Sequence, residues 1–76
     1  MIMEKQELRK YRQQVGQQYN AARTTQGWSV EQVAQMADVK TDTIEKIEAG
    51  AFNVPLDVLS RVAEVLGCEL NIKTKE

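Results

Sequence analysis

With 76 residues, the chain is long enough for one small domain, and its 42% of hydrophobic residues is typical of a folded globule. It contains one cysteine and no histidine, which excludes an internal disulfide and removes the commonest general base and metal ligand. The formal net charge of −1 is unusual for a nucleic-acid-binding protein, in which basic residues supply much of the affinity.

A long N-terminal helix is predicted over residues 4–26, whose composition is strongly helical. Leu8, Val15 and Ala22 recur every seven residues, which places them along one side of a helix. Gly16 lies in the middle and leaves two interpretations, one continuous helix or an added helix joined to the first helix of the domain. We favour the continuous helix, because a single glycine inside a helix costs only about 1 kcal/mol.

A second helix is predicted to begin at Ser29, after Gly27, which suits the end of the first helix. The Ser29 hydroxyl can cap the new helix, and Gln32 lies three residues later, at the spacing of a capping box. Trp28 can pack on Val33 as a hydrophobic staple. The apolar residues that follow have helical spacing and form one stripe: Val30, Val33, Ala34 and Ala37.

This pattern breaks at a short turn formed by Asp38, Val39 and Lys40. A turn of this length between two helices needs one residue near the left-handed region. Aspartate tolerates that conformation better than most non-glycine residues, so Asp38 can supply it. The next helix is predicted to start near Lys40 or Thr41.

In this next helix Ile44 and Ile47 are predicted to face inward, and Gly50 suits the C-cap. Two short helices joined by a tight turn, with an exposed face on the second, make a helix-turn-helix. We therefore assign residues 29–50 to a helix-turn-helix.

A last helix is predicted over residues 55–67, because Pro55 fixes the backbone of a first helical turn and Gly67 can end the helix. Its apolar residues are predicted to form one buried face: Leu56, Leu59, Val62, Ala63 and Leu66.

The tail over residues 68–73 changes to a period of two, which predicts a short strand with one buried face. That face consists of Cys68, Leu70 and Ile72, and Cys68 is expected to be a small buried residue rather than a reactive thiol. A lone strand leaves its backbone groups unpaired, so we expect the tail to pair with a second copy and form a dimer interface. The alternative is a tail that folds back on its own helices or stays disordered, in which case the long N-terminal helix becomes the candidate interface.

The whole pattern resembles the lambda-repressor/Cro-type, or XRE, family of helix-turn-helix proteins. The resemblance runs from about Gly16 to Leu70. It implies an all-α bundle of four to five helices in a single domain over residues 1–76, here with an extended N-terminal helix and a short C-terminal β-strand. Its residues are Arg23, Gly27-Trp28-Ser29, Val33-Ala34, Val39, Thr43-Ile44, Ile47-Glu48-Ala49-Gly50, Leu59, Ala63 and Leu66-Gly67.

The resemblance also implies that the second helix of the pair is a recognition helix that enters the major groove of DNA. Thr41, Asp42 and Lys46 then fall where the family reads bases, and Lys40 and Thr43 where it can hold phosphates. Lys46 can donate to guanine, and Asp42 can accept from cytosine N4. Alternatively, Asp42 is a solvated acid at the helix start, because a carboxylate near phosphates is costly unless it finds a donor.

Other family positions lie outside the recognition helix. Ser29 at the start of the preceding helix and Asn53 in the following loop are phosphate candidates, although Asn53 equally suits an ordinary loop. Val30 stands where the family usually has glutamine, which removes a polar contact to DNA. By the same resemblance, Arg23 and Glu48 form a structural ion pair that fixes the angle of the recognition helix.

The charge distribution opposes simple DNA binding. Residues 1–26 carry five basic and two acidic groups, whereas residues 28–50 carry two basic and five acidic groups. One alternative consistent with this balance is that the recognition helix contacts protein instead of DNA. The sequence offers no paired carboxylates, Cys/His cluster or glycine-rich phosphate loop, so we expect no enzymatic activity, cofactor, metal or small-molecule ligand.

From these features we predict a cytoplasmic, sequence-specific DNA-binding transcriptional regulator of the repressor type. We expect it to act as a homodimer on a palindromic operator, without contact to a membrane. The alternative is an antitoxin that binds and neutralises a toxin protein and also represses its own operon. Small proteins of the XRE family that add a C-terminal strand are often antitoxins.

Overall fold

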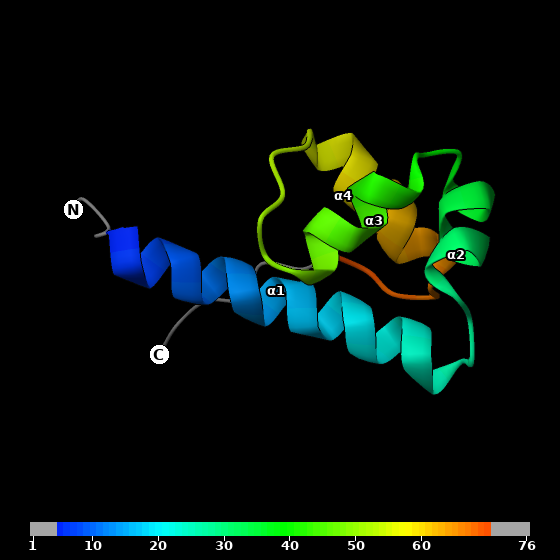
Figure 1. Cartoon of the computed structure of the whole chain (residues 1–76), viewed down its shortest axis with the longest axis horizontal. Helices are drawn as coiled ribbons and strands as arrows, with labels where there is room; N and C mark the ends of the chain where they lie inside the picture. Colours follow the sequence, from blue (N-terminus) through cyan, green and yellow to red (C-terminus); the bar gives the residue numbers. More distant parts are fainter. Residues whose placement is uncertain (1–4, 71–76) are drawn as a thin grey trace.

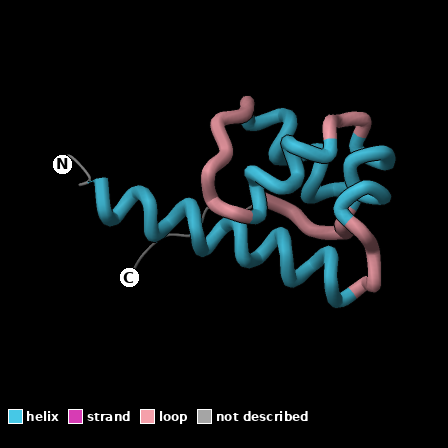
Figure 2. The backbone as a smooth tube through the Cα atoms, in the orientation of Figure 1, coloured by secondary structure: helices cyan, strands magenta, loops and turns pink. Residues whose placement is uncertain are grey.

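A computed structural model describes residues 5–70 and the side chains from residue 7 onward. This part of the chain forms four helices, α1 (Lys5–Thr25), α2 (Val30–Ala37), α3 (Thr41–Glu48) and α4 (Leu56–Val65). The three short helices pack together over the C-terminal part of α1, and the N-terminal turns of α1 extend beyond them (Figures 1 and 2). None of the described helices is long and apolar enough to cross a membrane.

The core lies where the three short helices meet the C-terminal half of α1. Its buried residues are Tyr19, Val33, Ala34, Ala37, Ile44, Ile47, Val62, Ala63 and Leu66. The inward positions predicted for the two central helices are therefore confirmed. The prediction that Leu56 is part of the buried face of the last helix is wrong, because Leu56 is 72% exposed at the first position of α4. The covered face of α4 begins one turn later with the half-buried Leu59.

Helix α1 runs unbroken through Gly16, which confirms the continuous helix. A Cβ atom at this position would lie 2.5 Å from the carbonyl oxygen of Ile47 and 2.6 Å from that of Glu48. These are backbone atoms at the end of α3, and they cannot rotate out of the way as a side chain could. Gly16 is thus the point at which α1 and α3 come into direct backbone contact.

The predicted helix boundaries of the helix-turn-helix are also confirmed. The Ser29 hydroxyl accepts a hydrogen bond from the Gln32 backbone at 3.1 Å, and the Gln32 side chain accepts one from the Ser29 backbone at 2.8 Å. Asp38 adopts the left-handed conformation that the short turn requires, with φ 56° and ψ 50°. Gly50 ends α3 with φ +77°.

The beginning of the tail differs from the sequence prediction. No strand is formed at residues 68–70, and the remainder of the predicted strand, including Ile72, lies outside the described residues. Cys68 is exposed, contrary to the expected burial. The reason is the turn at Gly67, after which the Cys68 backbone donates to the Ala63 carbonyl oxygen at 2.8 Å and the chain leaves the end of α4.

Candidate nucleic-acid interface

The outer face of α3 lies in solvent because two buried isoleucines hold its inner face against the core. Ile44 and Ile47 are 1% and 0% exposed, which fixes the opposite face of the helix against the core. Asp42 and Lys46, two of the residues expected to read bases, project from the outer face and are exposed. Thr41, the third, is half-buried in the first turn.

Asp42 and Lys46 contact each other across one turn of α3. The Lys46 ammonium nitrogen lies 3.1 Å from Oδ2 of Asp42, and the two side chains are 60% and 66% exposed. Exposed pairs at this spacing contribute only about 0.3–0.5 kcal/mol, so an incoming DNA group can replace either partner. The i, i+4 spacing of the two residues on a helix is enough to suggest this pair from the sequence.

The phosphate candidates come from three places in the chain: the start of α3, the start of α2 and the loop before α4. Lys40 is the exposed N-cap residue of α3 and makes no side-chain cap. Thr43 is half-buried, and Asn53 is exposed in the loop before α4. Ser29 is engaged in the capping box at the start of α2, where its hydroxyl stabilises the helix end.

Arg23 and Glu48 fix the far end of α3 to α1. Arg23 donates from Nε to Oε2 of Glu48 at 2.6 Å and from Nη2 to Oε1 at 3.0 Å, so the pair has the two-pronged geometry that suits arginine and carboxylate. A third arginine nitrogen, Nη1, donates to the Trp28 carbonyl oxygen at 2.8 Å. Asn20 adds a further hydrogen bond to Oε1 of Glu48 at 2.8 Å. The role of Asn20 was missed, because nothing in the sequence links it to a residue 28 positions later.

This arrangement determines the charge state of both partners. Burial alone would raise the pKa of Glu48, but the hydrogen bonds from Arg23 and Asn20 and the positive charge of Arg23 bring it below its ordinary value. The hydrogen bond to Glu48 raises the pKa of Arg23 against the opposing effect of burial. Both groups are therefore charged at neutral pH, and the angle between α1 and α3 is fixed by an intact ion pair.

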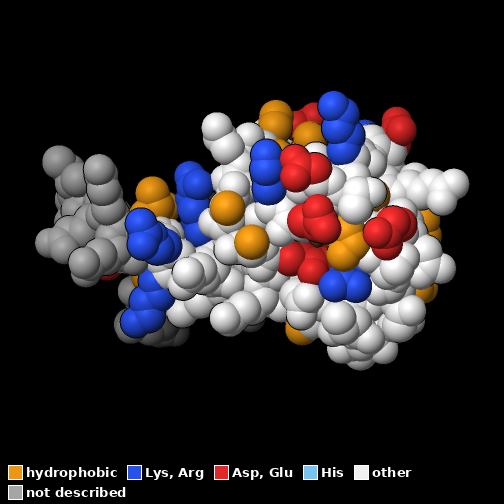
Figure 3. Space-filling view, in the orientation of Figure 1, with side chains coloured by type: hydrophobic (Ala, Val, Ile, Leu, Met, Phe, Trp, Pro, Cys, Tyr) orange, Lys and Arg blue, Asp and Glu red, His pale blue; other side chains and the backbone are white. Residues whose placement is uncertain are grey.

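The distribution of charge over the surface follows the division seen in the sequence. Most acidic side chains in this view gather over α3 and its surroundings, where some basic side chains lie among them, and further lysine and arginine side chains lie along the N-terminal part of α1 (Figure 3). Within the described residues, no three metal-ligating side chains come together in a possible metal site.

Comparisons with known proteins agree on the fold and on the helix-turn-helix. A family model described as Helix-turn-helix matches residues 20–72. The structure is similar to the crystal structure of the restriction-modification controller protein C.AhdI from Aeromonas hydrophila, with a TM-score of 0.74 and 27% sequence identity. The match covers 79% of this chain and 91% of that protein. A comparison with curated proteins gave no significant match.

Proposed function

The chain belongs to the Helix-turn-helix family, in its XRE-type branch of DNA-binding transcription regulators, and from this premise we propose that it is a sequence-specific repressor acting as a homodimer on a palindromic operator. The likeness to a controller protein supports a regulatory role. We further propose that residues 1–76 act as one domain in the cytoplasm.

The observation that carries this proposal is the way α3 is held. Buried isoleucines fix its inner face, and the Arg23–Glu48 pair fixes its end against α1. Its exposed face is therefore presented at a defined angle, as a helix that enters the major groove requires. A group held rigidly before binding loses less conformational freedom when DNA is bound.

In the proposed complex the first turns of α3 read base edges. Lys46 leaves Asp42 and donates to guanine O6 and N7, while Asp42 accepts from the N4 amino group of a cytosine. Thr41 contacts a neighbouring base edge. The phosphate contacts come from Lys40 and Thr43 at the start of α3, from Ser29 at the start of α2 and from Asn53 in the loop before α4.

We propose that the homodimer is formed through the tail. Cys68 is exposed and Leu70 is 42% exposed, so both can be covered by a second copy, together with Ile72. A two-fold axis through paired tails would make a self-complementary interface. The same axis would place two copies of α3 about 34 Å apart, on successive turns of the major groove.

The acidic surroundings of α3 favour a second candidate function. A protein partner with a basic surface would be attracted to this face, as expected for an antitoxin that binds a toxin and represses its own operon. Co-purification from the native host separates the two functions, because an antitoxin is recovered with a stoichiometric partner and a simple repressor is recovered without one.

The proposed function is tested by selecting bound duplexes from a randomised DNA pool. A repressor should enrich a palindromic sequence, and its affinity for that sequence should exceed its affinity for an unselected duplex by about 1000-fold or more. If the protein binds no duplex even at low salt, the proposal is wrong.

A further inference from the structure

One face of α1 continues from the core into the N-terminal extension. Gly16, Asn20 and Arg23 lie on this face, three or four residues apart, and contact the end of α3. Continuing with the same spacing toward the N-terminus leads to Arg12 and Arg9. The helix face that fixes α3 therefore ends in two arginines beside the loop that follows α3.

The extension is held against the loop that follows α3. Arg12 donates from Nη1 to the Phe52 carbonyl oxygen at 2.9 Å, and its guanidinium carbon lies 5.5 Å from the centre of the Phe52 ring. A Cβ atom at Gly50 would lie 2.9 Å from Cα of Gln13, so the loop and the helix backbone are in direct contact. The Arg12 side chain and the backbone of α1 beside it are thus held against the end of α3.

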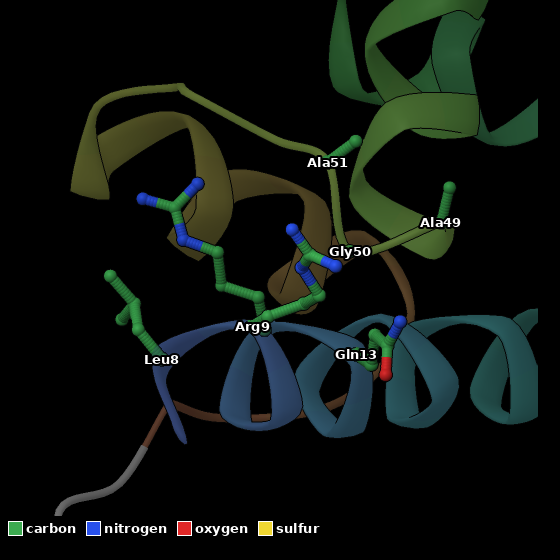
Figure 4. A pocket seen from close by; sticks show the side chains of 7 residues that line it. Leu8, Arg9, Gln13, Ala49, Gly50 and Ala51 are labelled. Atoms are coloured by element: carbon green, nitrogen blue, oxygen red, sulfur yellow. The ribbon is translucent and has the colours of Figure 1, made fainter. Parts of the chain in front are cut away.

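An open cavity of about 500 Å³ lies between the extension and the loop. It is lined by Leu8, Arg9, Arg12 and Gln13 on one side and by residues 49–51 on the other, and none of these described lining residues is acidic. Figure 4 shows the Arg9 side chain rising from α1 on the side of the helix where the loop lies. The cavity is positive, open to solvent and continuous with the end of α3.

We propose that this surface, formed by Arg9, Arg12 and the loop over residues 49–53, binds the phosphate backbone of double-stranded DNA beside the bases that α3 reads. The planar guanidinium groups suit bidentate contacts to phosphate oxygens. The surface supplies the positive charge that the acidic recognition helix lacks, at a place where it also orients α3 on the duplex. This inference rests on the proposed DNA-binding function.

A different face of the same helix provides a matched control. Lys10 is adjacent to Arg9 and is also exposed, but it lines a different hollow with Glu7, Tyr11 and Gln14. Arg9→Ala and Lys10→Ala therefore remove one positive charge each from neighbouring positions of the same helix turn. Only the first removal should affect a phosphate contact.

The test measures binding to a 30-bp mixed-sequence duplex and to the selected operator over a range of salt concentrations. Removing one phosphate contact reduces the slope of log affinity against log salt by about 0.9. We expect this reduction for Arg9→Ala, about twice the reduction for the double variant Arg9→Ala/Arg12→Ala, and a much smaller change for Lys10→Ala. The reduction should be similar on both duplexes, because phosphate contacts carry no sequence information.

Arg12 also contacts Phe52, so replacing it can affect folding as well as DNA binding. Thermal melts therefore establish whether each variant is folded. If the double variant unfolds, the salt dependence of Arg9→Ala alone decides the inference. Equal slopes for Arg9→Ala and Lys10→Ala, on duplexes that the wild-type protein binds, would overturn the phosphate surface and leave the proposed function intact. A wild-type protein that binds neither duplex would overturn both.

Discussion

The two halves of α1 differ in what they contact, although they form one continuous helix. The C-terminal half contains Gly16 and the buried Tyr19, and it carries the ion pair that fixes α3. The N-terminal half leaves Leu8 and Tyr11 45% and 46% exposed and contacts the body mainly through the loop after α3. The C-terminal half of the helix therefore serves stability, whereas the more exposed N-terminal half carries the proposed phosphate-binding surface.

The largest effect is expected at Gly16, where α1 and α3 touch. Gly16→Ala should destabilise the fold by about 3 kcal/mol, because the added methyl group meets two backbone carbonyl oxygens that cannot move independently. Gln17→Ala, at the next and exposed position, should change stability by less than about 0.5 kcal/mol. Denaturant unfolding of both variants measures the difference, and equal stabilities would contradict the close contact.

A smaller loss is expected when the ion pair at the end of α3 is broken. Glu48→Gln should cost about 2 kcal/mol at neutral pH, because it leaves the largely buried Arg23 without a charged partner. The pKa of Glu48 is lowered in the folded protein, so its contribution is present above the ordinary glutamate pKa of about 4.3 and is lost as the pH falls below it.

The stability difference between wild type and Glu48→Gln should therefore narrow under acid conditions. Melting temperatures of wild type and Glu48→Gln, measured between pH 7 and pH 3, show whether the difference narrows. A difference that stays constant over the whole range would show that the Glu48 charge does not contribute.

Tyr19 offers a milder test of the same half of the helix. Its hydroxyl donates to the Leu59 carbonyl oxygen at 2.8 Å and joins α1 to α4, so Tyr19→Phe should cost about 1 kcal/mol.

Burial, together with the nearby Cys68, raises the pKa of Tyr19 to about 12. A raised pKa favours the neutral form, so the wild type should lose stability as the pH rises from about 10 toward 12. Tyr19→Phe should lose less stability over that range. If the stabilities of wild type and Tyr19→Phe change in parallel with pH, the neutral Tyr19 hydroxyl does not contribute to stability.

The smallest effect is expected in the N-terminal half. Leu8→Ala should change the stability by less than about 0.5 kcal/mol, since Leu8 is 45% exposed and belongs to no buried cluster. Chemical unfolding at two protein concentrations checks this expectation. A loss of 2 kcal/mol or more that depends on concentration would mean that Leu8 is covered by a second copy, and the two halves of α1 would then differ less than the structure indicates.

Local features were predictable from the sequence, and long-range contacts were less so. The capping box of Ser29 and Gln32 and the left-handed Asp38 depend on neighbouring residues, so the pattern contained the information. The contact at Gly16 depends on α3, more than 30 residues away in the chain. The sequence alone therefore indicated only a glycine that a helix can tolerate, and not a glycine that the packing of α1 on α3 requires.

The candidate site shows the same limit. Which residues project from α3 follows from helical spacing, but the exposure of Leu56 and Cys68 follows from their places at the first position of α4 and after the turn at Gly67. Asn20 joins Glu48 only because α1 passes beside α3. The arrangement of Arg9 and Arg12 around a cavity likewise required the position of the loop.

The central claim is that α3 reads DNA, and Lys46 tests it most directly. Titrations of wild type and Lys46→Ala against the selected operator and its single-base variants should show a loss of about 1–3 kcal/mol and relaxed preference at one base pair. An equal loss on every duplex, with a shallower salt dependence, would contradict base reading by Lys46 and leave it a phosphate contact.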